Sequence, residues 1–161
     1  MFEKHVDTKL IEKYLERHGW HAHQALDQVG AVLTGWHEPT GDQYAMVIKV
    51  LEQQHAVMFQ LPGLLKAPLD ETPADRLSGL LLMLGLLNYE LVLGKWAYDP
   101  ADGEVSFRCG VPADGELSYE QFERHLVATM AATLDVKTLQ AILSGEKTAD
   151  VAIKEEKAKV G

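Results

Sequence analysis

A leucine-dense helix, predicted from Pro73 to about Asn88, constrains the fold more than any other part of the sequence. Thr72 suits the N-cap of this helix, Pro73 its first position and Asp75 its third, in the pattern of a capping box. At 100° per residue its apolar side chains form two stripes on nearly opposite sides. The first stripe contains Leu77, Leu80, Leu81, Leu84 and Leu87, and the second contains Leu82, Met83 and Leu86 with the small Gly79. Because a helix that packs on one sheet needs a single apolar stripe, this helix requires cover on two sides.

The second cover has two possible sources in a chain of 161 residues, which is the size of one domain. It is either the C-terminal helix or a second copy of the chain. We expect the second copy, since symmetric homodimers are common among small proteins. Burial of the large side chains of the second stripe would stabilise such an assembly by roughly 1.5–3 kcal/mol each.

Charge and composition exclude several classes of protein. The chain has 24 acidic and 15 basic residues, a net charge of −9, which disfavours nucleic acid as a partner. A single cysteine excludes a disulfide framework and a cysteine-rich zinc site. The longest uncharged apolar stretch, Leu77 to Tyr89, is shorter than the ~20 residues of a membrane span, and Met1 to His5 do not resemble a signal peptide. We therefore expect a cytoplasmic protein with no membrane partner.

The remaining periodicities predict an α+β fold: helix, three antiparallel strands, helix, β-hairpin and helix, with one twisted antiparallel sheet backed by helices. The predicted elements are a helix from Val6 to His18, strands at 29–37, 43–51 and 55–61, a loop marked by Pro62, Gly63 and Pro68, hairpin arms at 91–99 and 103–111, and a last helix from Ser118 to Ser144 that bends at Asp135. Asp7 or Thr8 caps the first helix and Gly19 ends it, while Ser118 and Gln121 form a capping box. Residues 1–145 are predicted as one domain, followed by a charged tail, 146–161, that is a frayed helix or disordered.

Candidate chemistry is sparse. His18, His21 and His23 are possible metal ligands, but no acid or cysteine completes a recognisable ligand set, so partly exposed histidines at a helix exit are the expected interpretation. Cys109 is in phase with Val105 and Phe107, which predicts a core residue. No motif or acid pair indicates a catalytic site. We expect no catalytic residue, no metal and no cofactor.

Three residues are candidates for contact with a partner protein. Trp36 ends a strand beside a turn, and Met46 and Met58 have the adaptable side chains that suit varied apolar partners. The alternative for the two methionines is that they fill the core.

The order of elements and one stretch of sequence resemble a known family. From Asn88 to Leu126 the chain reads Asn-x-x-Leu-Val-Leu-Gly-Lys-Trp-Ala-Tyr-Asp, a turn, Gly-Glu-Val-Ser-Phe-Arg, and then Gly-Glu-Leu-Ser-Tyr-Glu-Gln-Phe. This stretch is similar to the YbjN-like branch of the type III secretion chaperone-like fold. Phe2, Leu10, Leu15 and Gly19-Trp20 also fit, so the resemblance spans about 145 residues.

The resemblance implies a bacterial α+β homodimer without catalytic residues, acting as a regulator or chaperone-like protein that binds an extended segment of a partner protein. It also implies that the second helix and the strand after it form the dimer interface. Carried onto this chain, the candidates for that interface are Leu82, Met83, Leu86, Leu91 and Leu93. The alternative function is a small-molecule or metal-responsive sensor that uses the histidine cluster and Trp20.

Overall fold

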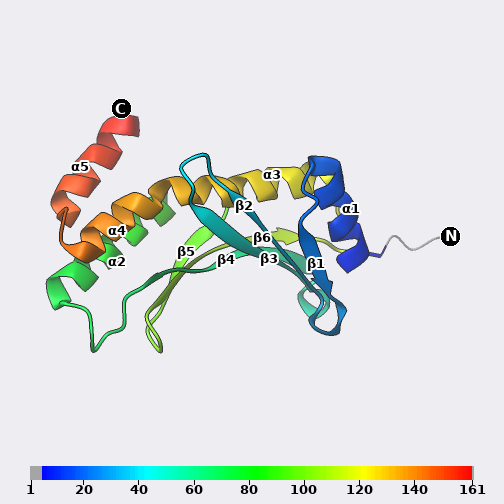
Figure 1. Cartoon of the computed structure of the whole chain (residues 1–161), viewed down its shortest axis with the longest axis horizontal. Coiled ribbons are helices and arrows are strands. Elements are labelled where there is room, and N and C mark those ends of the chain that lie inside the picture. The colour runs from blue at the N-terminus through cyan, green and yellow to red at the C-terminus, as the bar shows by residue number, and fades with distance from the viewer. Residues whose placement is uncertain (1–4, 161) are drawn as a thin grey trace. The chain divides into compact units, whose positions relative to one another are not determined.

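The computed structural model describes residues 5–160 and contains both helices and strands (Figure 1). In chain order they are α1 (Thr8–His18), β1 (His23–Leu26), η1 (Asp27–Val29), β2 (Ala31–His37), β3 (Gln43–Leu51), η2 (Glu52–Gln54), β4 (Ala56–Lys66), α2 (Ala74–Glu90), β5 (Lys95–Asp99), β6 (Glu104–Pro112), α3 (Tyr119–Ala131), η3 (Ala132–Asp135), α4 (Val136–Ser144) and α5 (Ala149–Val160).

The strands form one antiparallel sheet in the order β1-β2-β3-β4-β6-β5, backed by helices. The pairs Trp36↔Tyr44 and Val32↔Ile48 join β2 to β3, and Ile48 pairs in turn with Phe59 of β4. Since side chains alternate between the two faces of a strand, these residues share one face of the sheet. The predicted α+β class is confirmed.

The chain divides into two compact units, each built from two segments. Unit 1 comprises the chain up to Pro62 together with Arg108–Met130, and unit 2 comprises Gly63–Phe107 together with the chain from Ala131 onward.

In unit 1, α1 and α3 pack on the face of the sheet that carries Phe59. The rings of Phe59 and Phe122 lie 5.3 Å apart between centroids, and Ile11 and Leu15 of α1 are fully buried. The Tyr14 hydroxyl donates to the backbone oxygen of Leu117 at 2.6 Å, which ties α1 to the start of α3. As predicted, α1 is capped by the Asp7 side chain and ends at Gly19 in the left-handed conformation.

In unit 2, α2 packs beside α4 and α5 (Figure 1). The buried side of α2 contains Leu80, Met83, Leu84 and Leu87. A Cβ on Gly79 would stand 3.2 Å from Ala149 and 3.3 Å from Ile142, so α2 approaches the C-terminal helices closely at this residue. The C-terminal tail therefore contributes a helix, α5, whose Ala152 is buried.

Several local predictions differ from the structure. The hairpin arm predicted at 91–99 is a strand only from Lys95, and the strand predicted at 29–37 begins at Ala31. Strand β1 was not predicted, because its sequence, His-Gln-Ala-Leu, has no β-branched residue. Strand β4 continues to Lys66 through Pro62, where a loop was predicted. The register with β3 ends at Gln60, so the missing N–H of Pro62 costs no bond to β3. Helix α2 has Pro73 rather than Thr72 at its N-cap, since the Thr72 N–H donates to the Pro68 oxygen in the preceding turn.

The predicted capping box of the last helix is confirmed, and a 3-10 segment interrupts the helix where a bend was predicted. The Ser118 N–H donates to Gln121 Oε1 at 3.0 Å, and the Gln121 N–H donates to Ser118 Oγ at 3.1 Å. The helix tightens into η3, which ends at Asp135, before α4 resumes. Gly145 then ends α4 at a positive φ of 82°.

The helical run Tyr119–Ser144 is long and apolar enough, by length and composition alone, to cross a membrane. Of its most apolar window, 39% is buried inside the protein. Core helices of soluble proteins meet the same criteria of length and composition, so this run is weak evidence for a membrane segment. Phe122 and Leu126 are fully buried in unit 1, and Leu139 is fully buried in unit 2.

Candidate partner-binding surfaces

One face of α2 is apolar and uncovered within unit 2. Leu82 is 61% exposed and Tyr89 is 88% exposed, while Leu86 is half-buried. Gly85 lies between them with open space where a Cβ would stand. Positions 82, 85, 86 and 89 share one side of a helix. We call Leu82, Gly85, Leu86 and Tyr89 the α2 face.

The residues predicted for a dimer interface are divided between surface and core. Leu82 and Leu86 lie on the α2 face, and Leu91 and Leu93 are half-buried in the segment after α2. Met83 is fully buried, because one further step of 100° turns it from Leu82 toward the covered side of α2.

Tyr89 and Val92, which is 95% exposed, are the residues that the sequence analysis missed. Tyr89 follows Leu82 by seven residues, so helical spacing was a usable signal for it. Val92 lies beyond the helix end, where periodicity carries no information.

A row of half-buried aromatic side chains lies in unit 1. Trp20, just after α1, stacks on Trp36 of β2 with 5.5 Å between ring centroids, and Trp36 lies 5.3 Å from Tyr44 of β3. His18 meets the other end of the row, edge-on to Trp20 at 5.7 Å. We call Trp20, Trp36 and Tyr44 the aromatic row.

Two carboxylates lie at the Tyr44 end of this row. The Trp36 Nε1–H donates to Glu38 Oε1 at 2.8 Å, and the Glu38 N–H donates to the Asp42 backbone oxygen at 2.8 Å in the β2–β3 turn. Burial, followed by the negative charges of Asp42 and Glu38, raises the pKa of the Tyr44 hydroxyl. Trp36 and Tyr44 also border a hollow of about 490 Å³, and the residues that line it are Ala22, Thr34, Gly35, Trp36, His37, Gln43, Tyr44 and Ala45.

The structure does not bring the three predicted partner-contact residues together. Trp36 borders the hollow just described. Met46 is fully buried on the core face of β3, so it has no surface to offer a partner. Met58 pairs with Lys49, which puts it on the opposite face of the sheet from Trp36, and it lies 3.6 Å from where a Cβ on Gly110 would stand.

The three candidate metal ligands are engaged with carboxylates of helices. His23 Nδ1 lies 2.9 Å from Glu12 and His23 Nε2 lies 2.7 Å from Glu16, so the edge strand β1 is tied to α1. His21 also meets Glu16, whereas His18 faces Glu123 of α3 at 3.3 Å.

Hydrogen bonds from His23 and then from His21 lower the pKa of the Glu16 carboxyl. Within residues 5–160, no three His, Cys, Asp or Glu side chains are arranged to hold a metal ion. The histidine cluster therefore acts as a structural bridge in this structure.

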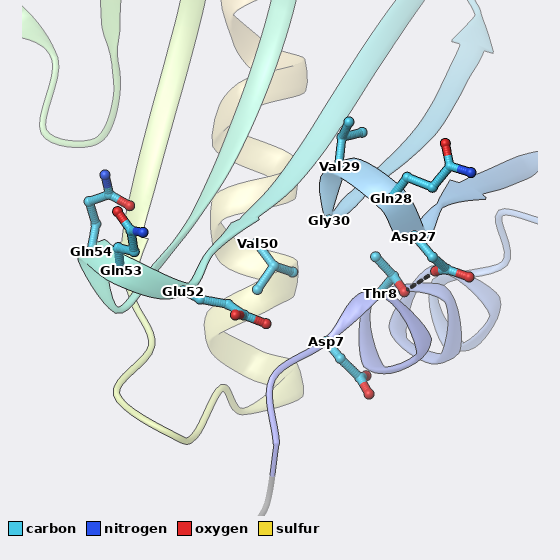
Figure 2. A pocket seen from close by; sticks show the side chains of 10 residues that line it. All are labelled: Asp7, Thr8, Asp27, Gln28, Val29, Gly30, Val50, Glu52, Gln53 and Gln54. Carbon is cyan, nitrogen blue, oxygen red and sulfur yellow. Dashed lines mark hydrogen bonds between the residues drawn. The ribbon is translucent and has the colours of Figure 1, made fainter.

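A second hollow, of about 450 Å³, lies where η1, η2 and the start of α1 meet (Figure 2). Figure 2 shows Thr8 and Asp27 facing each other, and the Thr8 hydroxyl donates to Asp27 at 2.7 Å. Asp7 is occupied in capping α1 through the Leu10 N–H. Two of the three carboxylates that line this hollow thus already hold protein donors, and Glu52 is exposed at its rim.

Cys109 lies fully buried in the core, where burial raises the pKa of its thiol while a hydrogen bond with Thr129 acts in the opposite direction. A thiol held in its protonated form is a poor nucleophile. No described hydrogen bond or ion pair links Cys109 to a histidine or a carboxylate.

Comparison with known proteins gives one matching family profile and several solved structures of similar fold. The profile of the family described as "YbjN: Putative bacterial sensory transduction regulator" matches residues 7–138. No curated protein sequence matches the chain.

Among solved structures, YbjN from E. coli is similar with a TM-score of 0.56 and 13% identity, over 88% of this chain and 92% of that one. The ExsC–ExsE complex is similar with a TM-score of 0.54 and 14% identity, over 86% of this chain and 96% of that one. The HopA1–SchA chaperone–effector complex matches with a TM-score of 0.47 and 15% identity, over 77% of this chain and 87% of that one. The first two likenesses confirm the predicted type III secretion chaperone-like fold.

Proposed function

Because the chain belongs to the YbjN family, we propose that it is a non-enzymatic chaperone-like or regulatory protein that acts as a homodimer in the bacterial cytoplasm and binds an extended segment of a partner protein. A protein of the same fold, ExsC, is found in a complex with ExsE. The α2 face is the observation that supports the homodimer. The sheet edges and the net charge of the chain support binding of a partner segment.

The α2 face supports a symmetric dimer. Within unit 2, α2 packs on α4, α5 and β5, which leaves Gly79 and Met83 of the second stripe buried but Leu82 exposed. The second stripe is thus covered only in part, and a second copy of α2 would cover the rest and bury Leu82 and Tyr89 from each chain. Full burial of such side chains stabilises by roughly 1.5–3 kcal/mol each. Gly85, with open space above it, would let two α2 helices approach closely.

The sheet offers a place for an extended partner segment. Strands β1 and β5 are its edges, and an edge strand presents backbone donors and acceptors that a partner strand can pair with. The net charge of −9 favours partner segments that are basic. Pairing through the backbone would give affinity for many sequences, and side-chain sites beside the edge would select among them.

Light scattering coupled to size exclusion tests the dimer. The wild-type chain should have twice the monomer mass of 17.9 kDa, and the double variant L82E/L86E should have the monomer mass, because two charges per chain would be buried in the interface. Leu134→Glu is the matched control, since Leu134 is 83% exposed in the same unit but lies outside the α2 face.

L134E should stay dimeric, and circular dichroism should show that all three proteins are folded. A dimer that persists in folded L82E/L86E, or a wild-type chain that is monomeric at micromolar concentration, would contradict the interface.

A further inference from the structure

The surroundings of the aromatic row are deficient in positive charge. Between Arg17 and Lys49 the sequence contains no lysine or arginine, while Asp27, Glu38 and Asp42 are acidic. Within the described residues, the hollow beside Trp36 and Tyr44 is lined by no lysine or arginine side chain. His37 is the basic side chain among the lining residues, and Glu38 and Asp42 are not among them, but the negative charges of both carboxylates act on the Tyr44 hydroxyl. The Tyr44 end of the row is therefore electronegative and has no lysine or arginine of its own.

Tyr44 is the end of the row that has a described ring on one side alone. Trp36 has Trp20 on one side and Tyr44 on the other, whereas Trp36 is the only ring described in contact with Tyr44. The face of an aromatic ring attracts cations. Glu38 receives the Trp36 indole N–H through one oxygen, so its second oxygen is left to accept from a ligand.

Among the described residues of unit 1, one arginine side chain already lies over an aromatic ring. The Arg17 guanidinium lies 3.9 Å from the centroid of the Tyr119 ring. A guanidinium can lie flat on a ring and at the same time donate two N–H groups to a carboxylate, which a lysine ammonium cannot do. An arginine side chain therefore matches a ring beside two carboxylates better than a lysine side chain does.

We propose that the Tyr44 end of the aromatic row binds an arginine side chain of the extended partner segment. The guanidinium lies on the Tyr44 ring and donates to Glu38 and to Asp42, whose Oδ2 already accepts from the Thr40 hydroxyl at 3.0 Å, so that Oδ1 is the oxygen left for the ligand. This assignment rests on the proposed function, because it names the chemistry of the partner that the protein binds. Through this contact the site would select partner segments that contain an arginine.

Nuclear magnetic resonance of the tryptophan indole N–H groups tests the site in the full-length protein. The probe is the capped peptide Gly-Ser-Arg-Val-Ser-Gly, compared with the same peptide carrying citrulline or lysine in place of arginine. The arginine peptide should shift the Trp36 indole signal, because that N–H is bonded to Glu38, and should leave the signal of the buried Trp96 in unit 2 unchanged. The citrulline peptide should give no shift, and the lysine peptide should bind more weakly.

Two sets of variants assign the interaction to these residues. The double variant E38Q/D42N should weaken binding of the arginine peptide by about five- to tenfold, the size expected for a partly exposed cation–π and ion-pair site. D70N/E71Q removes the same two charges from exposed positions outside the hollow and should leave affinity within about twofold. Tyr44→Phe should keep the binding and Tyr44→Leu should lose it.

Each opposite result overturns the inference. These results are equal binding of the citrulline or lysine peptide, equal weakening by D70N/E71Q, an unmoved Trp36 signal, or free arginine binding more tightly than the peptide, which would indicate a small-molecule ligand. None of them bears on the dimer, which light scattering measures separately, so failure of the arginine site is distinguishable from failure of the proposed function.

Discussion

At the scale of single residues, Asn88 illustrates how one side chain can replace a strand partner. Its Oδ1 accepts the Trp96 N–H at 2.7 Å, and its Nδ2 donates to the Trp96 oxygen at 3.0 Å. The end of α2 is thereby joined to the start of β5, within unit 2. Trp96 is itself buried whereas Asn88 is exposed, so the two bonds are partly shielded from solvent.

Replacement of Asn88 by alanine should therefore destabilise the protein by about 1–3 kcal/mol, since two partly shielded hydrogen bonds to the Trp96 backbone are lost. Urea denaturation measures the change. Asn88→Asp keeps the acceptor and loses the donor, so its loss should be intermediate. Gln140→Ala, at an exposed helical position, is the control and should change stability by less than about 0.5 kcal/mol. An N88A variant as stable as Q140A would show that the two bonds contribute nothing.

The sequence could draw attention to Asn88 and to the histidine cluster, but it could not show which residues their side chains contact. Asn88 was part of the motif that carried the family resemblance, yet its partner depends on the turn at Gly94, whose φ is +81°. The histidine cluster was visible too, but its partners were not. Glu12 and Glu16 lie on one side of a helix, and only the path of the chain after Gly19 brings His23 to both of them.

At the scale of elements, α2 has a matched pair of helical glycines in different surroundings. A Cβ on Gly79 would meet Ala149 at 3.2 Å and Ile142 at 3.3 Å, whereas one on Gly85 would meet nothing within 4 Å. Gly79 therefore sits in close packing, and Gly85 does not within this chain. Glycine inside a helix costs about 0.5–1 kcal/mol relative to alanine.

Gly85→Ala should stabilise unit 2 by about 0.5–1 kcal/mol, while Gly79→Ala should give no gain or a loss, because α4 and α5 must move by a few tenths of an ångström. Thermal denaturation should be measured for both in the L82E/L86E background, so that dimer dissociation does not enter the comparison. An equal gain from the two substitutions would mean that the C-terminal helices do not pack on α2 as described.

Elements with strong local signals were predictable, and those defined by long-range pairing were not. The Asp7 cap and the Ser118–Gln121 capping box both follow from short-range chemistry, and each is present. By contrast, β1 exists because Ala31–Thr34 of β2 offers it a free edge, and the last residues of β4 continue beyond its register with β3. The two stripes of α2 were visible in sequence, but which element covers each stripe depends on the tertiary fold.

At the scale of the whole molecule, both units are built from chain segments that also continue into the other unit. Strand β4 contributes Val57 and Phe59 to the buried core of unit 1 and Leu65 to that of unit 2. Strand β6 contributes Phe107 to unit 2 and Cys109 to unit 1. Neither unit can unfold completely without disrupting a strand that the other unit also needs.

We therefore expect a single cooperative transition, although the chain forms two units. The tryptophans provide a reporter in each unit, because Trp20 and Trp36 belong to unit 1 and Trp96 belongs to unit 2. In a chain labelled with 5-fluorotryptophan, fluorine resonances assigned by Trp→Phe variants would follow all three residues through one urea titration at fixed protein concentration.

Their midpoints should coincide. Earlier loss of the native Trp96 signal would instead show that unit 2 unfolds alone, and β4 and β6 would then have to fray at Gly63 and Phe107 while their other ends stay folded. That outcome would make the α2 face part of a separately folding unit, so that dimerisation through it would stabilise unit 2 without stabilising the aromatic row.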